Sequence, residues 1–343
     1  MAAGLLLLVA GWWISRPPPA FTVTTILPVI APDAPEVLPK PEPTPPPDEA
    51  ALLALSERDP LQAIDLAGKF LEGVAFDRVL AAALERLIDQ NPAAAAEIIA
   101  ALGPSDFQRV IAGRAAQAWA RIDPTAALTW AQALSDEAAR LRATREVFGT
   151  WAESDAAAAS RALGPLQSER EHALAALAVM TSWIPRDPAA ALAWGGALSS
   201  AAARNLVLTS AVQIWSGQDA GAALQWLETQ PEAIKAEIDA PAVVTVLRNL
   251  ARQEPAAAKA YVRAAPIGPE QNRAAEAISP VLARADPLAA MEWALTLENP
   301  ALRVPAFTDA FRAFQQSDPD EALKILATSD LSPEEKRRLA DYP

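Results

Sequence analysis

Apolar, small and acidic residues recur along most of the chain with a period of 32 residues. Residues 119–134, WARIDPTAALTWAQAL, return at 183–198 as WIPRDPAAALAWGGAL and, in weaker form, at 215–230. A fixed period of this length indicates a tandem array of helical units. If the acid of the Asp-Pro pair is position zero, nine units follow one another, with one longer spacing of 35 residues after Asp219. Position zero is occupied by Asp59, Asn91, Asp123, Asp155, Asp187, Asp219, Glu254, Asp286 and Asp318.

The Asp-Pro pair predicts the start of a helix in each unit. An Asp at the N-cap accepts hydrogen bonds from free amides of the first turn, and a Pro at the first helical position has no amide to leave unpaired. Positions 4, 7, 8 and 11 then lie on one face of the helix, and position 4 is always alanine. An invariant small residue there indicates that a neighbouring helix passes close to the backbone. The clearest copies are Asp123, Pro124, Ala127 and Trp130, and then Asp187, Pro188, Ala191 and Trp194.

A second helix is predicted in each unit. Gly103-Pro104 and Gly164-Pro165 are typical helix ends, with glycine in the left-handed cap conformation. Ser135, Ser168 and Ser199 or Ser200 then predict the next N-cap, and Glu171 has the capping-box spacing from Ser168. This helix ends near position minus four, which is Trp119, Trp151, Trp183 or Trp215 in four of the units.

All eight tryptophans beyond the N-terminal segment stand at position minus four or plus seven. A row of tryptophans could form an aromatic trough for peptides or glycans, because Trp is enriched among interface hot spots. Leu and Ile occupy the same positions in other units, and Trp183 and Trp194 flank the same cap. This alternation favours packing in the core.

The N-terminal part of the chain has a different composition. Residues 2–14, AAGLLLLVAGWWI, are apolar or small, and residues 17–48 contain twelve prolines. A cleaved signal peptide and a buried helix are both alternatives for residues 1–16, but the absence of Lys or Arg before Leu5 and the Pro run after Arg16 favour an uncleaved membrane anchor. The Pro-rich stretch 17–48 is then an extended linker, with a proline-motif ligand as the alternative. The repeats form a third region, 49–343.

Composition narrows the chemistry. The chain has a formal charge of −13, no cysteine and one histidine, His172. The acidic balance disfavours nucleic acid as a partner, because that affinity comes mainly from Lys and Arg. Neither a nucleophile paired with a base nor a Cys or His metal cluster is available, and no phosphate-binding or dinucleotide-binding motif occurs. We therefore expect no catalytic residue, no cofactor and no bound metal.

Arginines of the second helices fall in nearly one register, at Arg78, Arg109, Arg142, Arg204, Arg273 and Arg303. They could bind acidic groups of a partner, with Arg142, Arg204 and Arg303 as the candidates. The alternative is that they form ion pairs with neighbouring acids or remain solvated at the surface.

The junction from Asp123 to Trp130 resembles that of tetratricopeptide repeats, in which Asp-Pro leads into an Ala and then a Trp of the next unit. Asp187 to Trp194 and Asp286 to Trp293 match equally well. The period of 32 differs from the family's period of about 34, and Trp130 is followed by Ala131-Gln132-Ala133 where the family has Leu-Gly and Tyr. The resemblance implies an all-α, right-handed α-solenoid of about nine helix pairs, with a concave surface that holds peptides or helices of other proteins.

These features together predict a membrane-tethered, non-catalytic scaffold of a bacterial envelope, whose solenoid lies outside the cytoplasm and binds an unidentified protein or peptide. Two alternatives remain open. One is a structural spacer without a specific partner. The other is a ligand-binding or enzymatic solenoid, which would require a pocket with two or more ionisable groups close together.

Overall fold

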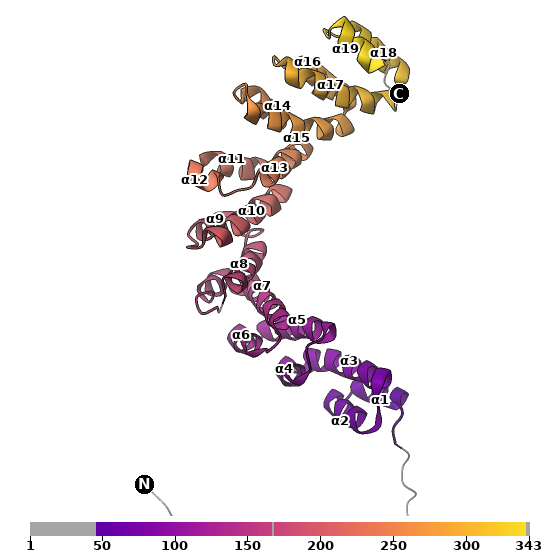
Figure 1. Ribbon diagram of the computed structural model, residues 1–343, viewed down its shortest axis with the longest axis vertical. Coiled ribbons are helices and arrows are strands. Elements are labelled where there is room, and N and C mark those ends of the chain that lie inside the picture. Colours follow the sequence, from indigo (N-terminus) through magenta and orange to yellow (C-terminus); the bar gives the residue numbers. More distant parts are fainter. Residues whose placement is uncertain (1–45, 167, 341–343) are drawn as a thin grey trace, which may run out of the picture. The chain divides into compact units, whose positions relative to one another are not determined.

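The computed structural model describes residues 46–340 except residue 167, and these residues form helices joined by short connections, with no strand among them (Figure 1). Helix α1 (Glu49–Ser56) precedes the first complete unit. The first helices of the units are α2 (Pro60–Phe70), α4 (Pro92–Ala101), α6 (Pro124–Ala133), α9 (Pro188–Gly196), α11 (Ala220–Thr229), α14 (Pro255–Ala264), α16 (Pro287–Leu295) and α18 (Pro319–Thr328). The second helices are α3 (Gly73–Gln90), α5 (Asp106–Ala120), α7 (Glu137–Arg161), α8 (Glu169–Trp183), α10 (Ala201–Gln218), α13 (Ala240–Gln253), α15 (Pro269–Ala285), α17 (Pro300–Gln315) and α19 (Pro333–Ala340).

Helix α7 contains two helices that meet at a kink. Asp155 has non-helical angles, φ −146° and ψ 86°, and its carboxylate accepts a hydrogen bond from the Ala158 amide at 2.8 Å. Asp155 therefore caps a new helix inside α7. The expected first helix of that unit is present although Asp155 is not followed by proline.

The acids at position zero cap helices by one recurring geometry. The Asp123 carboxylate accepts from the Ala126 amide at 2.9 Å, and the Asp187 carboxylate accepts from the Ala190 amide at 3.0 Å. Pro124 and Pro188 take the first helical positions. Glu254 is the exception, because its longer side chain makes no cap hydrogen bond.

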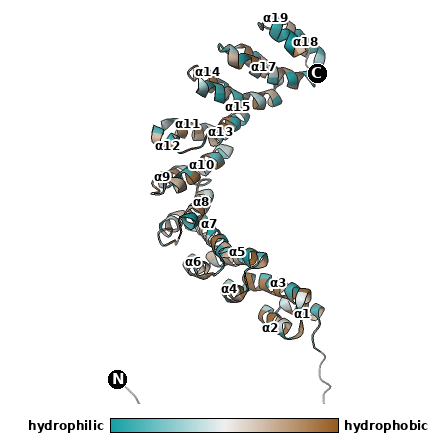
Figure 2. Ribbon diagram, in the orientation of Figure 1, coloured by the Kyte–Doolittle hydropathy of each residue, from teal (hydrophilic) through white to brown (hydrophobic). Residues whose placement is uncertain are grey.

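Each helix packs mainly on helices near it in the sequence. The second helices contact one another in chain order, as α5 contacts α7, α8 contacts α10, and α13 contacts α15. The first helices pack on the second helices of their own units, as α6 does on α7 and α16 does on α17 (Figure 1). Apolar residues, brown in Figure 2, alternate with polar ones along these helices. The arrangement is compatible with a helical-repeat fold.

The alanines at position four lie in the core, as the pattern predicts. Each is at most 2% exposed. A larger side chain there would separate helices that pack closely. The nine residues are Ala63, Ala95, Ala127, Ala159, Ala191, Ala223, Ala258, Ala290 and Ala322.

The prediction of left-handed glycine caps is wrong. Among the described glycines only Gly73 and Gly268 have positive φ, so Gly103 and Gly164 do not. Helix α4 instead ends at Ala101, and its C-cap residue Leu102 has an extended backbone. The Gln108 side-chain amide donates to the Leu102 carbonyl at 2.8 Å and to the Ile99 carbonyl at 3.2 Å. A side chain from the next helix thus satisfies carbonyls at the end of α4.

The start of α7 also differs from the expectation. Its N-cap is Asp136 rather than Ser135, and the Asp136 carboxylate accepts from the Ala139 amide at 2.9 Å. Ser168 and Ser200 cap α8 and α10 as predicted. The stronger acceptor is therefore used where Ser and Asp stand side by side.

The expected anchor, residues 1–16, and all but the end of the expected linker, residues 17–48, lie outside the described residues. No helix within the described range is both long and apolar enough to span a membrane.

Candidate functional site

The tryptophans pack against the core. Trp183 and Trp194 meet across the Asp187 cap with ring centroids 5.9 Å apart, and Trp119 and Trp130 meet across the Asp123 cap at 6.1 Å. Trp293 is buried, and the other seven described tryptophans are half-buried against core residues. Those seven are Trp119, Trp130, Trp151, Trp183, Trp194, Trp215 and Trp226.

Trp130 also links two units through its indole nitrogen. Nε1 donates to the Ala96 carbonyl of the preceding unit at 3.0 Å. This hydrogen bond satisfies the polar edge of a side chain whose ring fills the junction. The structure thus places Trp130 between two units, where it joins them.

Two arginines of the shared register connect neighbouring units. Arg204 donates through Nε to the Glu237 carboxylate at 2.6 Å and through a terminal nitrogen to the Leu198 carbonyl at 2.6 Å. Arg109 donates to the Asp136 carboxylate of the next unit at 3.2 Å. The pKa of Glu237 is lowered, chiefly by its hydrogen bonds from Arg204. Arg204 is therefore committed to a contact within the chain.

The remaining arginines of this register have different surroundings. Arg78 pairs with Glu49 at 2.9 Å. Arg142 is exposed and lies over Gly113, where a Cβ would come within 2.9 Å of its Nε. Arg303 buries an Nε that has no hydrogen-bond partner among the described residues. The structure does not gather Arg142, Arg204 and Arg303 into one site, since they stand on α7, α10 and α17.

The single histidine and the acids form no metal-binding group in the described part of the chain. His172 is half-buried on α8. No group of three or more His, Asp or Glu side chains within residues 46–340, residue 167 excepted, is placed to hold a metal ion.

The unit that begins at Asp219 breaks the repeat. From Asp187 to the next N-cap, Ser200, is 13 residues, whereas from Asp219 to its equivalent, Asp239, is 20 residues. The second helix compensates in part, because α13 has 14 residues and α10 has 18. The spacing of 35 therefore results from a longer connection, which includes the short helix α12 (Glu232–Lys235), and from the loss of about one turn of α13.

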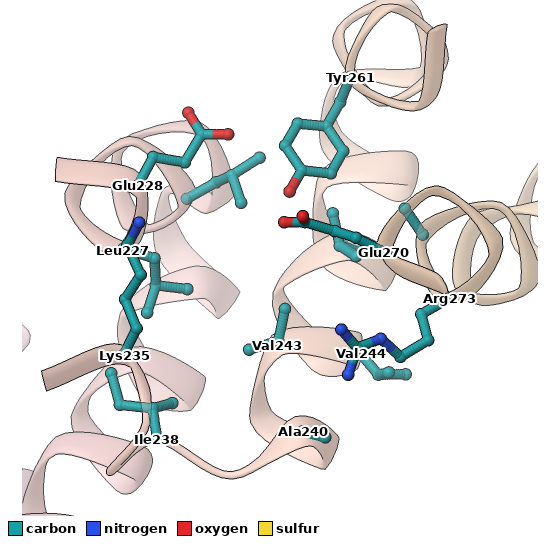
Figure 3. A pocket seen from close by; sticks show the side chains of 13 residues that line it. Leu227, Glu228, Lys235, Ile238, Ala240, Val243, Val244, Tyr261, Glu270 and Arg273 are labelled. Carbon is teal, nitrogen blue, oxygen red and sulfur yellow. The ribbon is translucent and has the colours of Figure 1, made fainter. Parts of the chain in front are cut away.

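A cavity of about 270 Å³ lies beside this longer connection (Figure 3). It is bordered by α11, α13, α14 and α15, and by the extra segment that contains α12. Most of its wall is aliphatic, formed by Leu224, Leu227, Ile238, Val243, Val244 and Leu247.

Five polar side chains border the same cavity. Figure 3 shows the Tyr261 hydroxyl and the Glu270 carboxylate pointing toward one another, with Glu228 and Lys235 on the opposite side. Lys235 pairs with Glu232 at 3.0 Å. The other four, Tyr261 with Glu228, Glu270 and Arg273, form no hydrogen bond or ion pair within the described residues.

Tyr261 reports the electrostatics of the cavity. Burial raises the pKa of its hydroxyl above the ordinary tyrosine value, and the carboxylates of Glu228 and Glu270 raise it further. Arg273 lowers this pKa by a smaller amount. The hydroxyl is neutral near pH 7, so it can donate or accept a hydrogen bond but is not activated as a base.

The 32-residue period predicts the break at residues 230–232 but not the cavity or its polar groups. Two signals were available. One is the spacing of 35, and the other is Tyr261, which stands at position plus seven where four units have Trp. No family model, curated protein sequence or solved structure matches the chain, so the likeness to tetratricopeptide repeats rests on the quoted residues alone.

Proposed function

We propose that this chain is a membrane-tethered, non-catalytic scaffold that binds a partner protein through the surface of a right-handed, tetratricopeptide-like α-solenoid. The cavity beside α12 carries the proposal, because it lies at the irregular connection and presents unpaired polar side chains beside an apolar wall. Concave apolar sites with a few convergent polar groups are the usual form of a binding site.

The repeated polar residues support the same proposal by elimination. The acids at position zero cap helices, and Arg109 and Arg204 join neighbouring units. A partner is therefore recognised by residues that differ between units. The unit from Asp219 to Glu254 differs most from the others in helix length and connection.

Tethering rests on the apolar segment 2–14 and the Pro-rich linker, and the extracytoplasmic location follows from that arrangement. A topology reporter fused after Pro343 tests it. We expect a reporter that is active only outside the cytoplasm to give signal, and signal from a cytoplasmic reporter would contradict the proposed location.

The binding function is tested by capture of partners from detergent-solubilised cells with the full chain as bait. We expect one partner at stoichiometric yield. Capture of none would favour the structural spacer, whose helices serve only to set a distance.

A ligand-binding or enzymatic role is the second candidate, and the cavity is the observation that favours it. Two carboxylates and a tyrosine border one space, as such a role requires. The raised pKa of Tyr261 moves that group away from the near-neutral value that suits a general acid or base, which favours binding over catalysis.

A further inference from the structure

The cavity has room for an aliphatic side chain of a partner. Its volume of about 270 Å³ exceeds the roughly 150 Å³ of an engineered apolar cavity that holds benzene. Val243 and Val244 on α13 and Leu227 on α11 offer aliphatic surface on different sides of it (Figure 3). An aliphatic side chain of leucine size is therefore a suitable occupant for this wall.

The charged side chains that border the cavity give its edge a net negative charge. Glu228 on α11 and Glu270 on α15 border it from two helices, and Lys235 is already balanced by Glu232. With Lys235 paired, two carboxylates remain at the cavity against one guanidinium, that of Arg273. The whole chain also carries a formal charge of −13. A cationic group is therefore favoured beside the apolar occupant.

We propose that this cavity binds a peptide segment of the partner protein by accepting one aliphatic side chain, with a lysine or arginine next to it that pairs with Glu228 and Glu270. The proposal rests on the proposed scaffold function and assigns it a site. The Tyr261 hydroxyl has no hydrogen-bond partner within the described residues. It hydrogen-bonds to the peptide backbone or to whichever of the Glu228 and Glu270 carboxylates pairs with the cation.

The two tyrosines of the sequence, Tyr261 and Tyr342, make the site observable. The full chain in non-ionic detergent is labelled with 3-fluorotyrosine, and the Tyr342→Phe variant assigns the two fluorine resonances. The probe is the acetylated and amidated pentapeptide Ala-Lys-Leu-Lys-Ala. We expect it to shift the Tyr261 resonance saturably and to leave the Tyr342 resonance in place.

Two matched peptides test the charged contact and the aliphatic contact separately. Ala-Glu-Leu-Glu-Ala keeps the leucine and reverses the charge, whereas Ala-Lys-Ala-Lys-Ala keeps the charge and removes the aliphatic group. Each should bind at least about tenfold more weakly than the first peptide, since each loses one of the two contacts. Equal affinity of the three peptides would overturn the proposal.

Variants test the same contacts from the protein side. The double variant Glu228→Gln with Glu270→Gln should weaken the Lys-Leu-Lys peptide about tenfold, because charge-assisted hydrogen bonds are lost. Glu276→Gln is the matched control, an exposed acid of α15 that does not border the cavity. Val243→Phe fills the cavity and should abolish the shift, while circular dichroism confirms that the helices remain.

The outcomes of the peptide titration and of the partner capture are independent of each other. If a partner is captured but no peptide moves the Tyr261 resonance, the scaffold function stands and the cavity proposal is wrong. If the peptide binds as described but no partner is captured, the site stands as a peptide site and the scaffold function is wrong.

Discussion

Two junctions between units show how one repeat pattern gives two outcomes. At the junction before α6, the Trp130 ring packs against Trp119 with centroids 6.1 Å apart, and its Nε1 donates to the Ala96 carbonyl at 3.0 Å. At the junction before α14, Leu250 and Tyr261 stand at the corresponding positions, and the tyrosine hydroxyl borders the cavity. Aromatic packing fills the first junction, whereas at the second junction a cavity remains beside Tyr261.

The two junctions also differ in their helix caps. Asp123 caps α6 through its carboxylate, whereas Glu254 makes no cap hydrogen bond to α14. The Glu254 carboxylate lies beside Gly221 of the preceding unit, where a Cβ would come within 3.0 Å of it. The regular junction thus has a side-chain cap and an aromatic pair, whereas α14 at the irregular junction lacks the cap.

The largest effect expected from this comparison is the loss of an aromatic residue at a regular junction. Trp194→Ala removes a ring that pairs with Trp183 and packs against the core, so the free energy of unfolding should fall by about 3–5 kcal/mol. Tyr261→Ala should cost less, because that side chain faces a cavity. Urea unfolding followed by circular dichroism measures both.

The same pair of variants separates packing from binding. Trp194→Ala should lower the melting temperature and leave peptide binding unchanged while the protein is folded. Tyr261→Ala should lower the melting temperature less and should weaken peptide binding. Unchanged melting of Trp194→Ala together with lost binding would show that the tryptophans form a ligand trough.

Helix starts were predictable from the sequence because a cap is local. The Asp187 carboxylate reaches an amide only three residues away, so residue type and spacing are enough to predict it. Helix ends were less predictable. Gly103 was expected to form the cap, but the free carbonyl of Leu102 is satisfied by Gln108 of the next helix, a contact that depends on packing.

The cavity could not be derived from the period. A spacing of 35 residues shows that three were added, yet the structure lengthens one connection by seven residues and shortens one helix by four. The added and lost residues nearly cancel in the sequence. The space beside Tyr261 depends on where the added and lost residues lie. Their positions depend on where α13 begins, and its N-cap is Asp239.

A second prediction compares the caps directly. Asp187→Ala removes the acceptor for the Ala190 amide and should reduce the free energy of unfolding by about 1 kcal/mol. Glu254→Ala, the matched change at the irregular junction, should have a much smaller effect, because no cap hydrogen bond is lost. Equal destabilisation in urea titrations would show that Glu254 acts as a cap in solution.

A third prediction converts the irregular junction toward the regular one. Glu254→Asp shortens the side chain to the length that caps α6 and α9, so the stability should rise by about 0.5 kcal/mol. Asp187→Glu is the reciprocal change and should lower it by a similar amount. A fall in the melting temperature for Glu254→Asp would show that the contact of Glu254 with Gly221 outweighs the missing cap.

The smallest effect concerns the ion pair that fastens the extra segment to α10. The pKa of Glu237 is lowered by Arg204, so the folded state binds fewer protons there than the unfolded state. The stabilisation is present above the ordinary glutamate pKa of about 4.3 and is lost as the pH falls through the lower pKa of the folded protein. The stability difference between the wild type and Glu237→Gln should therefore be measurable at pH 7, should shrink as the solution is acidified, and should also shrink with added salt.

Glu232→Gln is the control on the same segment, since Glu232 is exposed and pairs only with Lys235 in the described structure. A Glu237→Gln difference that is independent of pH would indicate that Glu237 stabilises the segment by packing alone, and the regular and irregular units would then differ in their connections but not in the charges that secure them.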